Sequence, residues 1–265
     1  IAIGIGAALA GMRPICEIQF ADFIYPAFNQ IISEAARFYY RSDGQWPVPM
    51  VIRAPYGGGI GGGLYHSQSI EAFFAHSPGL KIVVPGNPHD AKGLLKSAVR
   101  DPNPVLFLEP KKGYRLIRGD VPEGEYTVPI GPAQVTRSGT DLTVYAYGMM
   151  HFYTLQAAEM VAAEDGIQCE VVDLRTLAPL DKDTVLASFK QTGKALIVYE
   201  DNRFLGYGAE IAALLSDEAF EYMDGPIRRL TGPDVPGVPF SHSMQDFFMP
   251  DPAKIAAAMR ELAAY

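Results

Sequence analysis

The sequence predicts an α/β protein with two domains, each built from a mostly parallel sheet flanked by helices. Short apolar strand-like runs alternate with helix-like segments, an order typical of parallel strands covered by helices on both faces. The length of 265 residues suits two such domains. A stretch rich in charge, glycine and proline, residues 110–125, shows no periodicity and is expected to link them.

The composition excludes several classes of function. Apolar residues make up 48% of the chain, and no apolar run approaches the roughly 18 residues of a membrane span. The net charge of −8 makes nucleic acid and anionic membranes poor partners. Cys16 and Cys169 are too few for a disulfide framework or a metal cluster, which fits a reducing compartment.

The first half of the chain begins with small residues, 1–11, that indicate a helix ending at Gly11. Pro14–Phe20 has the character of a buried strand. Pro26–Tyr40 has that of a helix, with proline in its first turn and apolar residues at helical spacing. No initiator Met and no basic signal-peptide region precede this start, so we expect residues to be missing upstream.

The loop of residues 21–25 follows the first predicted strand. Loops at the carboxyl ends of strands are where α/β folds bind ligands, so this position is a candidate for a site. The residue types by themselves favour the alternative, in which Phe23 and Tyr25 are aromatic residues of the core.

A glycine-rich loop, residues 54–69, joins the predicted strand Met50–Ile52 to a helix that begins near Ile70. Glycines permit positive φ and bring backbone N–H groups close to a ligand, and we expect Ser67 or Ser69 to cap the helix. The loop lacks the Gly-Lys-Ser/Thr ending of a phosphate loop and the acidic residue of a dinucleotide fold. A structural loop and a ligand loop both remain open; we favour a cofactor or substrate loop.

The rest of the first half continues the alternation of strands and helices. Lys81–Val84 and Val105–Glu109 are predicted strands. Between them Asn87 should cap a helix that runs to about Val99, with Pro88 at its first position.

The second half repeats this order with different residues. Its predicted elements are strands at 142–147, 168–172, 195–199 and 227–230, and helices at 152–165, 181–189, 209–220 and 252–264. Gly166 should end the first of these helices.

His66 is the histidine best placed for chemistry. It follows the glycine loop just ahead of a helix, where it can move protons near neutral pH, although a packing or capping role is equally compatible with the sequence. His76 and His89 lie within or near helices, where a structural or solvated role is expected.

Two further polar groups follow predicted elements. Asp101 and Asn103, with Pro102 between them and Pro104 after, have oxygen atoms suited to a cation, but the composition favours a plain helix-ending turn. Residues 200–203 follow a strand and could belong to a site; we expect a solvated loop.

Longer motifs carry a resemblance to a known family. Residues 13–31, 65–76, 90–95, 173–181 and 232–236 closely resemble the β subunit of thiamine-diphosphate-dependent 2-oxo acid dehydrogenases, and the likeness covers essentially the whole chain. Phe20-Ala-Asp-Phe-Ile and Tyr65-His-Ser-Gln-Ser look most like the branched-chain (2-oxoisovalerate) type, with pyruvate and acetoin relatives close by.

The resemblance implies a transketolase-like architecture. Residues 1–120 would form an N-terminally incomplete pyrimidine-binding domain, and residues 127–265 the transketolase C-terminal domain. Thiamine diphosphate and Mg²⁺ would be held mostly by an α subunit. In this chain Phe23 would pack on the aminopyrimidine ring, Gln19 would lie close to it, and His66 would face the reacting carbon and protonate the departing lipoyl sulfur.

The resemblance also implies a second ion and further partners. A structural monovalent cation, K⁺, would be bound around Val48, Met50, Val51, Ala98, Asp101 and Asn103. The chain would join an α2β2 heterotetramer that docks on a lipoyl acyltransferase core and acts on a small 2-oxo acid. The compartment would be the cytoplasm in a bacterium or the mitochondrial matrix in a eukaryote.

One departure from the family affects catalysis. The glutamate that contacts the pyrimidine N1′ atom in this family would fall a few positions before Ile1, so no residue here is assigned that role. We expect the missing upstream segment to carry it; an impaired subunit is the alternative. A pyruvate or acetoin dehydrogenase β subunit and a non-catalytic assembly subunit are the rival functions.

Overall fold

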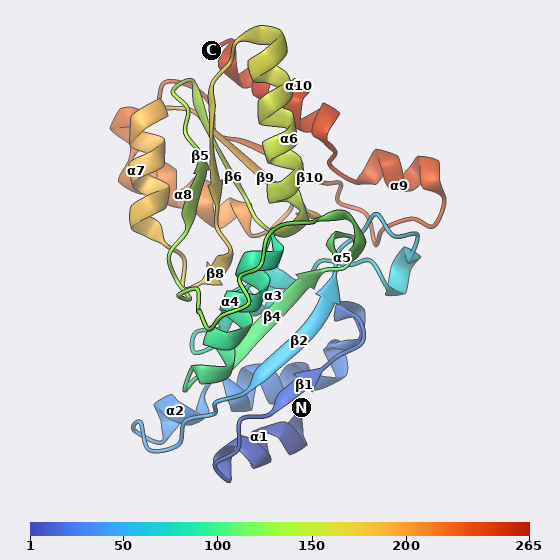
Figure 1. The fold of residues 1–265 in the computed structure, drawn as a ribbon, viewed down its shortest axis with the longest axis vertical. Coiled ribbons are helices and arrows are strands. Elements are labelled where there is room, and N and C mark those ends of the chain that lie inside the picture. Colours follow the sequence, from blue (N-terminus) through green and yellow to red (C-terminus); the bar gives the residue numbers. More distant parts are fainter.

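The computed structural model describes residues 1–265 and contains two five-stranded sheets, one in each half of the molecule (Figure 1). The first sheet has the order β1-β2-β4-β3-β8 and the second β10-β9-β6-β7-β5. All strand pairs are parallel except those of β8 with β3 and of β5 with β7. The predicted two-domain, mostly parallel α/β architecture is therefore confirmed.

The N-terminal domain holds the first five helices and four strands. In chain order they are α1 (Ala2–Leu9), β1 (Ile15–Glu17), α2 (Phe38–Arg41), β2 (Val51–Tyr56), α3 (Glu71–Ala75), β3 (Lys81–Val83), α4 (Pro88–Arg100), β4 (Val105–Pro110) and α5 (Gly113–Leu116). Short 3₁₀ turns at Ala21–Phe23, Tyr25–Ala27 and Gly63–Tyr65 and a π-helical turn at Gln30–Ala35 lie between them.

The C-terminal domain contains the remaining strands and helices. They are β5 (Gln134–Arg137), β6 (Leu142–Ala146), α6 (Gly148–Asp165), β7 (Cys169–Asp173), β8 (Thr176–Ala178), α7 (Lys182–Thr192), β9 (Ala195–Asn202), α8 (Gly208–Glu218), β10 (Arg228–Gly232), α9 (His242–Phe248) and α10 (Pro252–Ala263). A 3₁₀ turn, Phe220–Tyr222, follows α8. None of the helices is both long and apolar enough to cross a bilayer.

Alternation of side chains along the second sheet divides its core between two pairs of helices. On β6 and β9, Tyr145, Ile197 and Tyr199 belong to the core cluster that includes α7 and α8. Val144 and Val198 point the other way and pack with residues of α6 and α10. Successive side chains of a strand face opposite sides, so both faces of this sheet are buried, as expected beneath helices on each side.

One core cluster crosses the boundary between the two domains. Ile52, Tyr56 and Leu108 from the first sheet belong to the same cluster as Tyr145 and Tyr147 from the second. The short strand β8 also crosses it, since Thr176 pairs with Val83 and Ala178 with Ile82 at the edge of the first sheet. The sequence does not predict β8, because three residues are too few for a periodic pattern.

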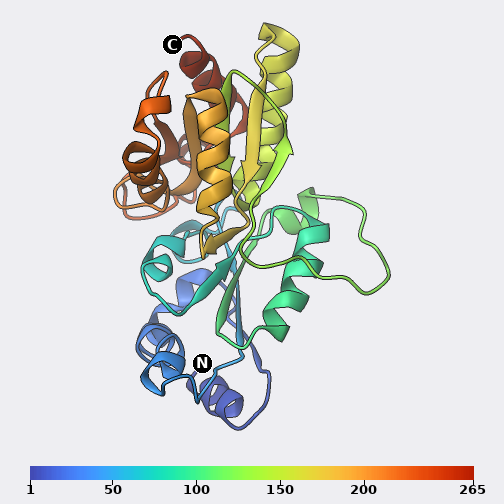
Figure 2. The same cartoon turned by 90° about the vertical axis from the view of Figure 1, so that its left-hand side faces the viewer.

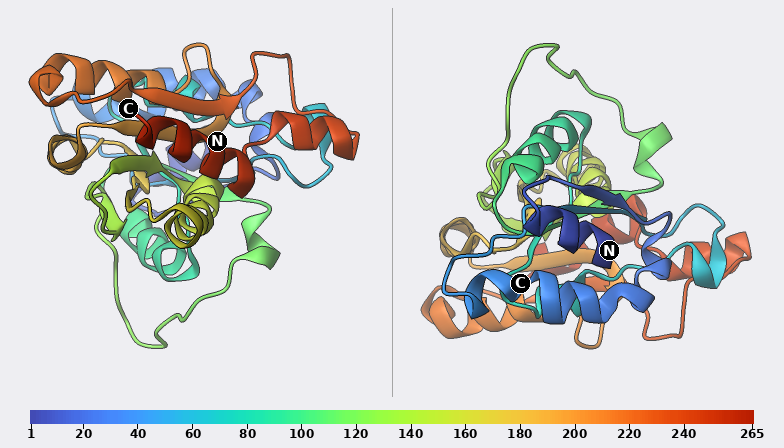
Figure 3. Two further views of the ribbon diagram at one scale, coloured as in Figure 1. Left: turned by 90° about the horizontal axis from the view of Figure 1, so that it is seen from above. Right: turned by 90° about the horizontal axis from the view of Figure 1, so that it is seen from below.

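The linker between the domains runs over α4. Figures 2 and 3 show residues 117–130 leaving the body of the molecule as a long loop on the α4 side. Lys92 donates hydrogen bonds to linker carbonyls, and Glu125 pairs with Lys96 and Arg100 at 2.8 and 2.5 Å. The segment expected to be irregular also contains α5.

Several predicted element boundaries were wrong. The helix predicted at Pro26–Tyr40 is interrupted, with a π-helical turn followed by the short α2. The strand placed at Met50–Ile52 continues to Tyr56, so the glycine loop begins later than expected. Neither Ser67 nor Ser69 caps α3: its N-cap is Ile70, without a side-chain hydrogen bond. In contrast, the caps predicted at Asn87 and Gly166 are confirmed.

Candidate active site

Two segments far apart in the sequence bring Phe20, Phe23 and His66 together. The ring centroid of His66 lies 4.8 Å from that of Phe20 and 5.3 Å from that of Phe23, both edge to face. Phe23 keeps 43% of its surface exposed, so one side of this cluster is open. The expectation that Phe23 and Tyr25 are core aromatics was wrong, because Tyr25 is 44% exposed as well.

Two 3₁₀ turns produce this arrangement. The chain leaves β1 and turns tightly at Ala21–Phe23, and the glycine loop ends in a second turn at Gly63–Tyr65. The backbone N–H of Gln68 donates to the Asp22 carboxylate at 3.4 Å, which ties the two turns together. Burial raises the pKa of Asp22, against the lowering effect of this and neighbouring backbone N–H groups and of His66.

Two polar atoms beside the cluster are buried without a hydrogen-bond partner. They are Oδ1 of Asp22 and Oγ of Ser67. Buried polar atoms normally have partners, so unpaired ones at an open aromatic face indicate a place for a polar ligand. Lys111 brings positive charge, with its ammonium 5.4 Å from the ring centroid of Phe20.

Gln19 stands at the carboxyl end of β1, next to this cluster in the sequence. Its side chain is exposed and makes no hydrogen bond within the chain. The structure therefore brings the rings of Phe23 and His66 together, and Gln19 makes no hydrogen bond to His66. His76 is exposed at the end of α3, and His89 stacks on Tyr126, as expected for residues without a chemical role.

The backbone of the glycine loop donates hydrogen bonds to side chains of the C-terminal domain. The N–H of Gly58 donates to Oε2 of Glu200 on β9 at 2.8 Å, and the N–H of Gly61 donates to Oε1 of Gln245 on α9 at 3.0 Å. Figure 1 shows the cyan loop beside α9. At these two amides, the backbone donors expected to serve a ligand bind protein side chains instead.

Residues 200–203 are not the solvated loop that the sequence suggested. β9 extends through Asn202, and Glu200 is fully buried. Burial raises the pKa of Glu200 to about 7, although the Gly58 N–H and Lys112 lower it. Burial likewise raises the pKa of Asp201 to about 6. The sequence does not show how far β9 extends, because residues 200–203 are all polar or charged. Apolar character therefore does not separate strand from loop among them.

A second buried carboxylate lies just beyond the histidine. Glu71, in the first turn of α3, accepts a hydrogen bond from the hydroxyl of Tyr147 at 2.7 Å. Burial and the nearby Asp201 raise the pKa of Glu71 to about 8, while the Tyr147 hydroxyl lowers it. Oε2 of Glu71 and the hydroxyl of Tyr56 have no partner. Sequence analysis missed this group, since its members come from four separate segments.

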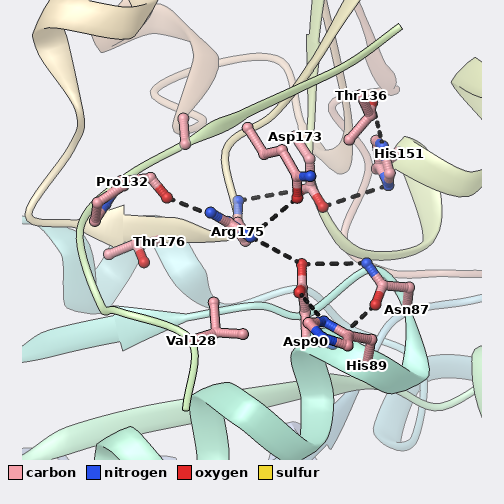
Figure 4. Close-up of polar contacts among 12 residues, drawn as sticks. Asn87, His89, Asp90, Val128, Pro132, Thr136, His151, Asp173, Arg175 and Thr176 are labelled. Carbon is pink, nitrogen blue, oxygen red and sulfur yellow. Dashed lines mark hydrogen bonds and ion pairs between the residues drawn. The ribbon is translucent and has the colours of Figure 1, made fainter. Parts of the chain in front are cut away.

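A charged network joins the domains on another side (Figure 4). Nη1 of Arg175 donates to Oδ2 of Asp90 at 3.2 Å and to Oε1 of Gln134 at 3.0 Å, while its Nε donates to the carbonyl of Pro132 at 3.2 Å. Desolvation would raise the pKa of Asp90, but hydrogen bonds from His89 and Asn87 and the charge and hydrogen bond of Arg175 hold it below its ordinary value.

The same network continues into the C-terminal domain. The backbone N–H of Arg175 donates to Oδ1 of Asp173 at 3.1 Å, and Oδ2 of Asp173 lies 3.4 Å from Nδ1 of His151 (Figure 4). Burial raises the pKa of Asp173 despite the charges of His151 and Arg175. His151 in turn lies 2.9 Å from the hydroxyl of Thr136.

The six residues expected around a cation come from neighbouring segments at the amino ends of β2 and β4. Carbonyls of Val48, Met50, Ala98 and Asp101 each already accept one hydrogen bond. The carboxylate of Asp101 pairs with Lys81 at 2.5 Å and accepts from Asn103. No group of three His, Cys, Asp or Glu side chains in the structure is arranged to hold a metal ion.

Comparison with known proteins explains this arrangement. The family described as the transketolase pyrimidine-binding domain matches residues 1–117, and the transketolase C-terminal domain matches residues 131–255. The 2-oxoisovalerate dehydrogenase subunit β of Bacillus subtilis is 56% identical over 99% of this chain and 80% of its own length. This chain belongs to the family of 2-oxoisovalerate dehydrogenase β subunits. The resemblance found in the sequence is thus confirmed.

Other members and a solved structure agree. Subunit β 2 of the mitochondrial 2-oxoisovalerate dehydrogenase of Arabidopsis thaliana is 47% identical over 100% of this chain and 73% of its own length. Relatives named for pyruvate or acetoin are 42–44% identical. A split-gene transketolase, described as an inactive β4 tetramer, superposes with a TM-score of 0.77 and 25% identity over 99% of this chain and 79% of its own.

Membership in the family states the general activity. A β subunit of a 2-oxo acid dehydrogenase works with an α subunit, and both matched domains are those of thiamine-diphosphate-dependent enzymes. The relatives include bacterial chains and chains named as mitochondrial.

Proposed function

We propose that this β subunit, with its α partner, catalyses the oxidative decarboxylation of 2-oxoisovalerate-type acids and the reductive acylation of a lipoyl group. The observation that carries the proposal is the contact of His66 with Phe20 and Phe23 on an open face at the carboxyl edge of the first sheet. Ligands of α/β folds bind at this edge. The 2-oxoisovalerate subunits are 43–56% identical to this chain and the pyruvate and acetoin subunits 42–44%, and the 56% match supports the branched-chain substrate class.

The residues present fit the aminopyrimidine end of thiamine diphosphate. The half-exposed ring of Phe23 offers an apolar face to a heteroaromatic ring, and the unpaired oxygens of Asp22 and Ser67 offer polar partners nearby. Gln19 would lie close to the ring from the end of β1. When bound, the cofactor supplies the electron sink for decarboxylation. The α subunit would hold the diphosphate and Mg²⁺.

His66 would then act as a proton carrier. The two phenyl rings fix its imidazole edge on, so a ring nitrogen can face the open side of the cluster. A histidine held there can donate a proton to a lipoyl sulfur that leaves as a thiolate. The aromatic surroundings exclude water from two sides of the ring, which favours transfer to the substrate over transfer to solvent.

The role of His66 is tested by replacing it. His66→Ala, assembled with the α subunit, should lose about 100-fold or more in lipoamide acylation, within the usual effect of a general acid, and much less in decarboxylation measured with an artificial oxidant. His76→Ala is the matched control, because His76 is exposed ten positions along at the end of α3. Equal loss in the two assays would reject the assignment.

Substrate choice is tested by comparing 2-oxoisovalerate with pyruvate on full-length β mixed with α, Mg²⁺ and thiamine diphosphate. We expect a clear preference for 2-oxoisovalerate in kcat/KM. Activity with pyruvate alone would move the chain to the sibling substrate class. Inactivity with both acids, despite an intact N-terminus, would support an assembly role without catalysis.

We also propose that K⁺ binds near Val48, Met50, Val51, Ala98, Asp101 and Asn103, and that the C-terminal domain contributes to β–β contact and docking on the acyltransferase core. Backbone carbonyls that keep a free lone pair suit a large monovalent ion. Lys81 already pairs with the carboxylate of Asp101, so the ion would rely on carbonyl oxygens. Equal melting temperatures in K⁺ and in choline would contradict the cation site.

A further inference from the structure

We propose that Glu200 is a positioning residue that, together with Gln245, holds the glycine loop against the C-terminal domain and thereby sets the place of His66. The loop is defined here as residues 57–69. The inference rests on the proposed function, in which His66 donates the proton to the departing lipoyl sulfur. What it adds is that two residues of the C-terminal domain determine the position of His66, which lies in the N-terminal domain.

Glu200 contacts the loop where the backbone is most restricted. Its Oε2 accepts the Gly58 N–H at 2.8 Å, and a methyl group on Gly57 would lie 2.8 Å from the same oxygen. Gly57 also has φ +91°, a conformation that other residues rarely adopt. The close approach of backbone and carboxylate therefore requires both glycines and the acid.

Gln245 provides a second anchor further along the loop. This buried side chain on α9 accepts the N–H of Gly61 at 3.0 Å. Around the two anchors the loop packs directly on Met249 and Phe240, since a methyl group on Gly58 or Gly63 would overlap those side chains. Three glycines, Gly57, Gly58 and Gly63, thus serve close packing against one surface of the C-terminal domain.

The anchors act on His66 because the loop is closed on itself. The N–H of Gly57 donates to the carbonyl of Gln68 at 3.2 Å, which joins the two ends of the loop. Within it, the backbone of His66 lies directly against Gly62, next to the Gly61 anchor. Displacement of Gly58 or Gly61 must therefore move His66 relative to Phe23.

The choice of residue at position 200 also points to this role. Glu200 is fully buried on β9, where the preceding residues from Ala195 to Tyr199 are apolar or aromatic and buried. A buried acid is costly, and an apolar side chain would serve packing better. The one hydrogen bond that its carboxylate makes is the bond from the N–H of Gly58. The presence of an acid at position 200 is therefore explained by its hydrogen bond with the glycine loop and not by the packing of β9.

The test uses Glu200→Ala, Glu200→Gln and Gln245→Ala in full-length β with its α partner. Glu170→Ala is the control, because Glu170 is equally buried on β7 of the same sheet but contacts Thr143 instead of the loop. Hydrogen exchange at the amides of Gly58 and Gly61 reports the anchors directly. Lipoamide acylation and artificial-oxidant decarboxylation report their consequence.

We expect Glu200→Ala to speed exchange at Gly58 by tenfold or more and to lower kcat for lipoamide acylation by about tenfold, with decarboxylation nearly unchanged. Glu200→Gln keeps an acceptor oxygen and should restore both, and Gln245→Ala should affect Gly61 chiefly. Exchange that changes no more than in Glu170→Ala would overturn the proposal. Faster exchange without loss of acylation would overturn the link to His66.

The exchange measurement does not depend on activity. If the unsubstituted αβ pair decarboxylates no 2-oxo acid, the proposed function fails, while exchange at Gly58 and Gly61 still decides whether the anchors exist. If Glu200→Ala does not fold, Gln245→Ala and Glu200→Gln still give both readouts.

Discussion

The two polar junctions between the domains balance their charge in different ways. At the α4 junction, Arg175 neutralises the buried Asp90 and hydrogen bonds from three residues surround its carboxylate. At the glycine-loop junction, Glu200 is buried with a backbone N–H as its hydrogen-bond partner and with no cation in an ion pair. The α4 junction is therefore an ion pair. The glycine-loop junction depends on a buried carboxylate that has one N–H donor and no cation beside it in an ion pair.

This difference predicts opposite responses to protons. The pKa of Asp90 lies below its ordinary value, so its contribution to stability is present at neutral pH and is lost in acid. The pKa of Glu200 is raised to about 7, so its contribution declines as the pH rises toward neutrality. We infer that the Arg175–Asp90 junction holds the two domains together. The Glu200 junction instead serves to position the glycine loop.

The largest effect should come from breaking the ionic junction. Arg175→Met leaves Asp90 buried without its cation, and removal of one partner from a buried pair typically costs about 3–5 kcal/mol in the free energy of unfolding. Lys182→Met is the control, since its ion pair with Glu218 is exposed. Chemical denaturation measures both. A loss below about 1 kcal/mol in Arg175→Met would remove the distinction between the junctions.

A pH series sharpens the comparison at Glu200. The folded pKa of about 7 exceeds that of an unfolded glutamate, so the folded state holds the proton more tightly, and stability should fall as the pH rises from about 4.5 to 7. Glu200→Gln should remove on the order of 2 kcal/mol of this decline. Denaturation of both proteins across that range provides the measurement, and parallel curves would show that Glu200 ionises normally.

Gly57→Ala tests the steric side of the loop junction. A side chain at φ +91° strains the backbone, and the added methyl group meets the Glu200 carboxylate, so we expect a loss of about 1–3 kcal/mol. Gly6→Ala, in α1 with open space around it, should instead be neutral or gain up to about 1 kcal/mol. Similar stability of the two variants in thermal denaturation would contradict the tight contact.

The smallest effect should come from the outer anchor. Gln245→Ala leaves the N–H of Gly61 without its acceptor, at a cost of about 1 kcal/mol in unfolding free energy. Gln191→Ala removes a hydrogen bond from an exposed side chain to the carbonyl of Gly139, on another side of the domain. It should destabilise less than Gln245→Ala, and Gln245→Ala alone should speed amide exchange in the glycine loop. If the loop amides exchange equally slowly in both variants, Gln245 does not anchor the loop and Glu200 alone does.

Elements that depend on neighbours along the chain could be predicted from the sequence. Apolar runs located the central strands β4, β6 and β9, because these strands are buried on both faces and need no alternation. Local hydrogen bonds made the caps at Asn87 and Gly166 predictable. The long motifs identified the family, and with it the expected places of Phe23 and His66.

The contacts of the glycine loop and of the acids around it became evident in the folded protein. Six glycines predict unusual φ angles and close approach, but they do not say whether a ligand or a protein surface approaches. Glu200 and Gln245 lie more than 140 positions after Gly58 and Gly61, and Glu71, Tyr56 and Tyr147 meet across the domain boundary. Burial of a polar residue depends on what packs against it from distant segments, and local patterns carry no record of those contacts.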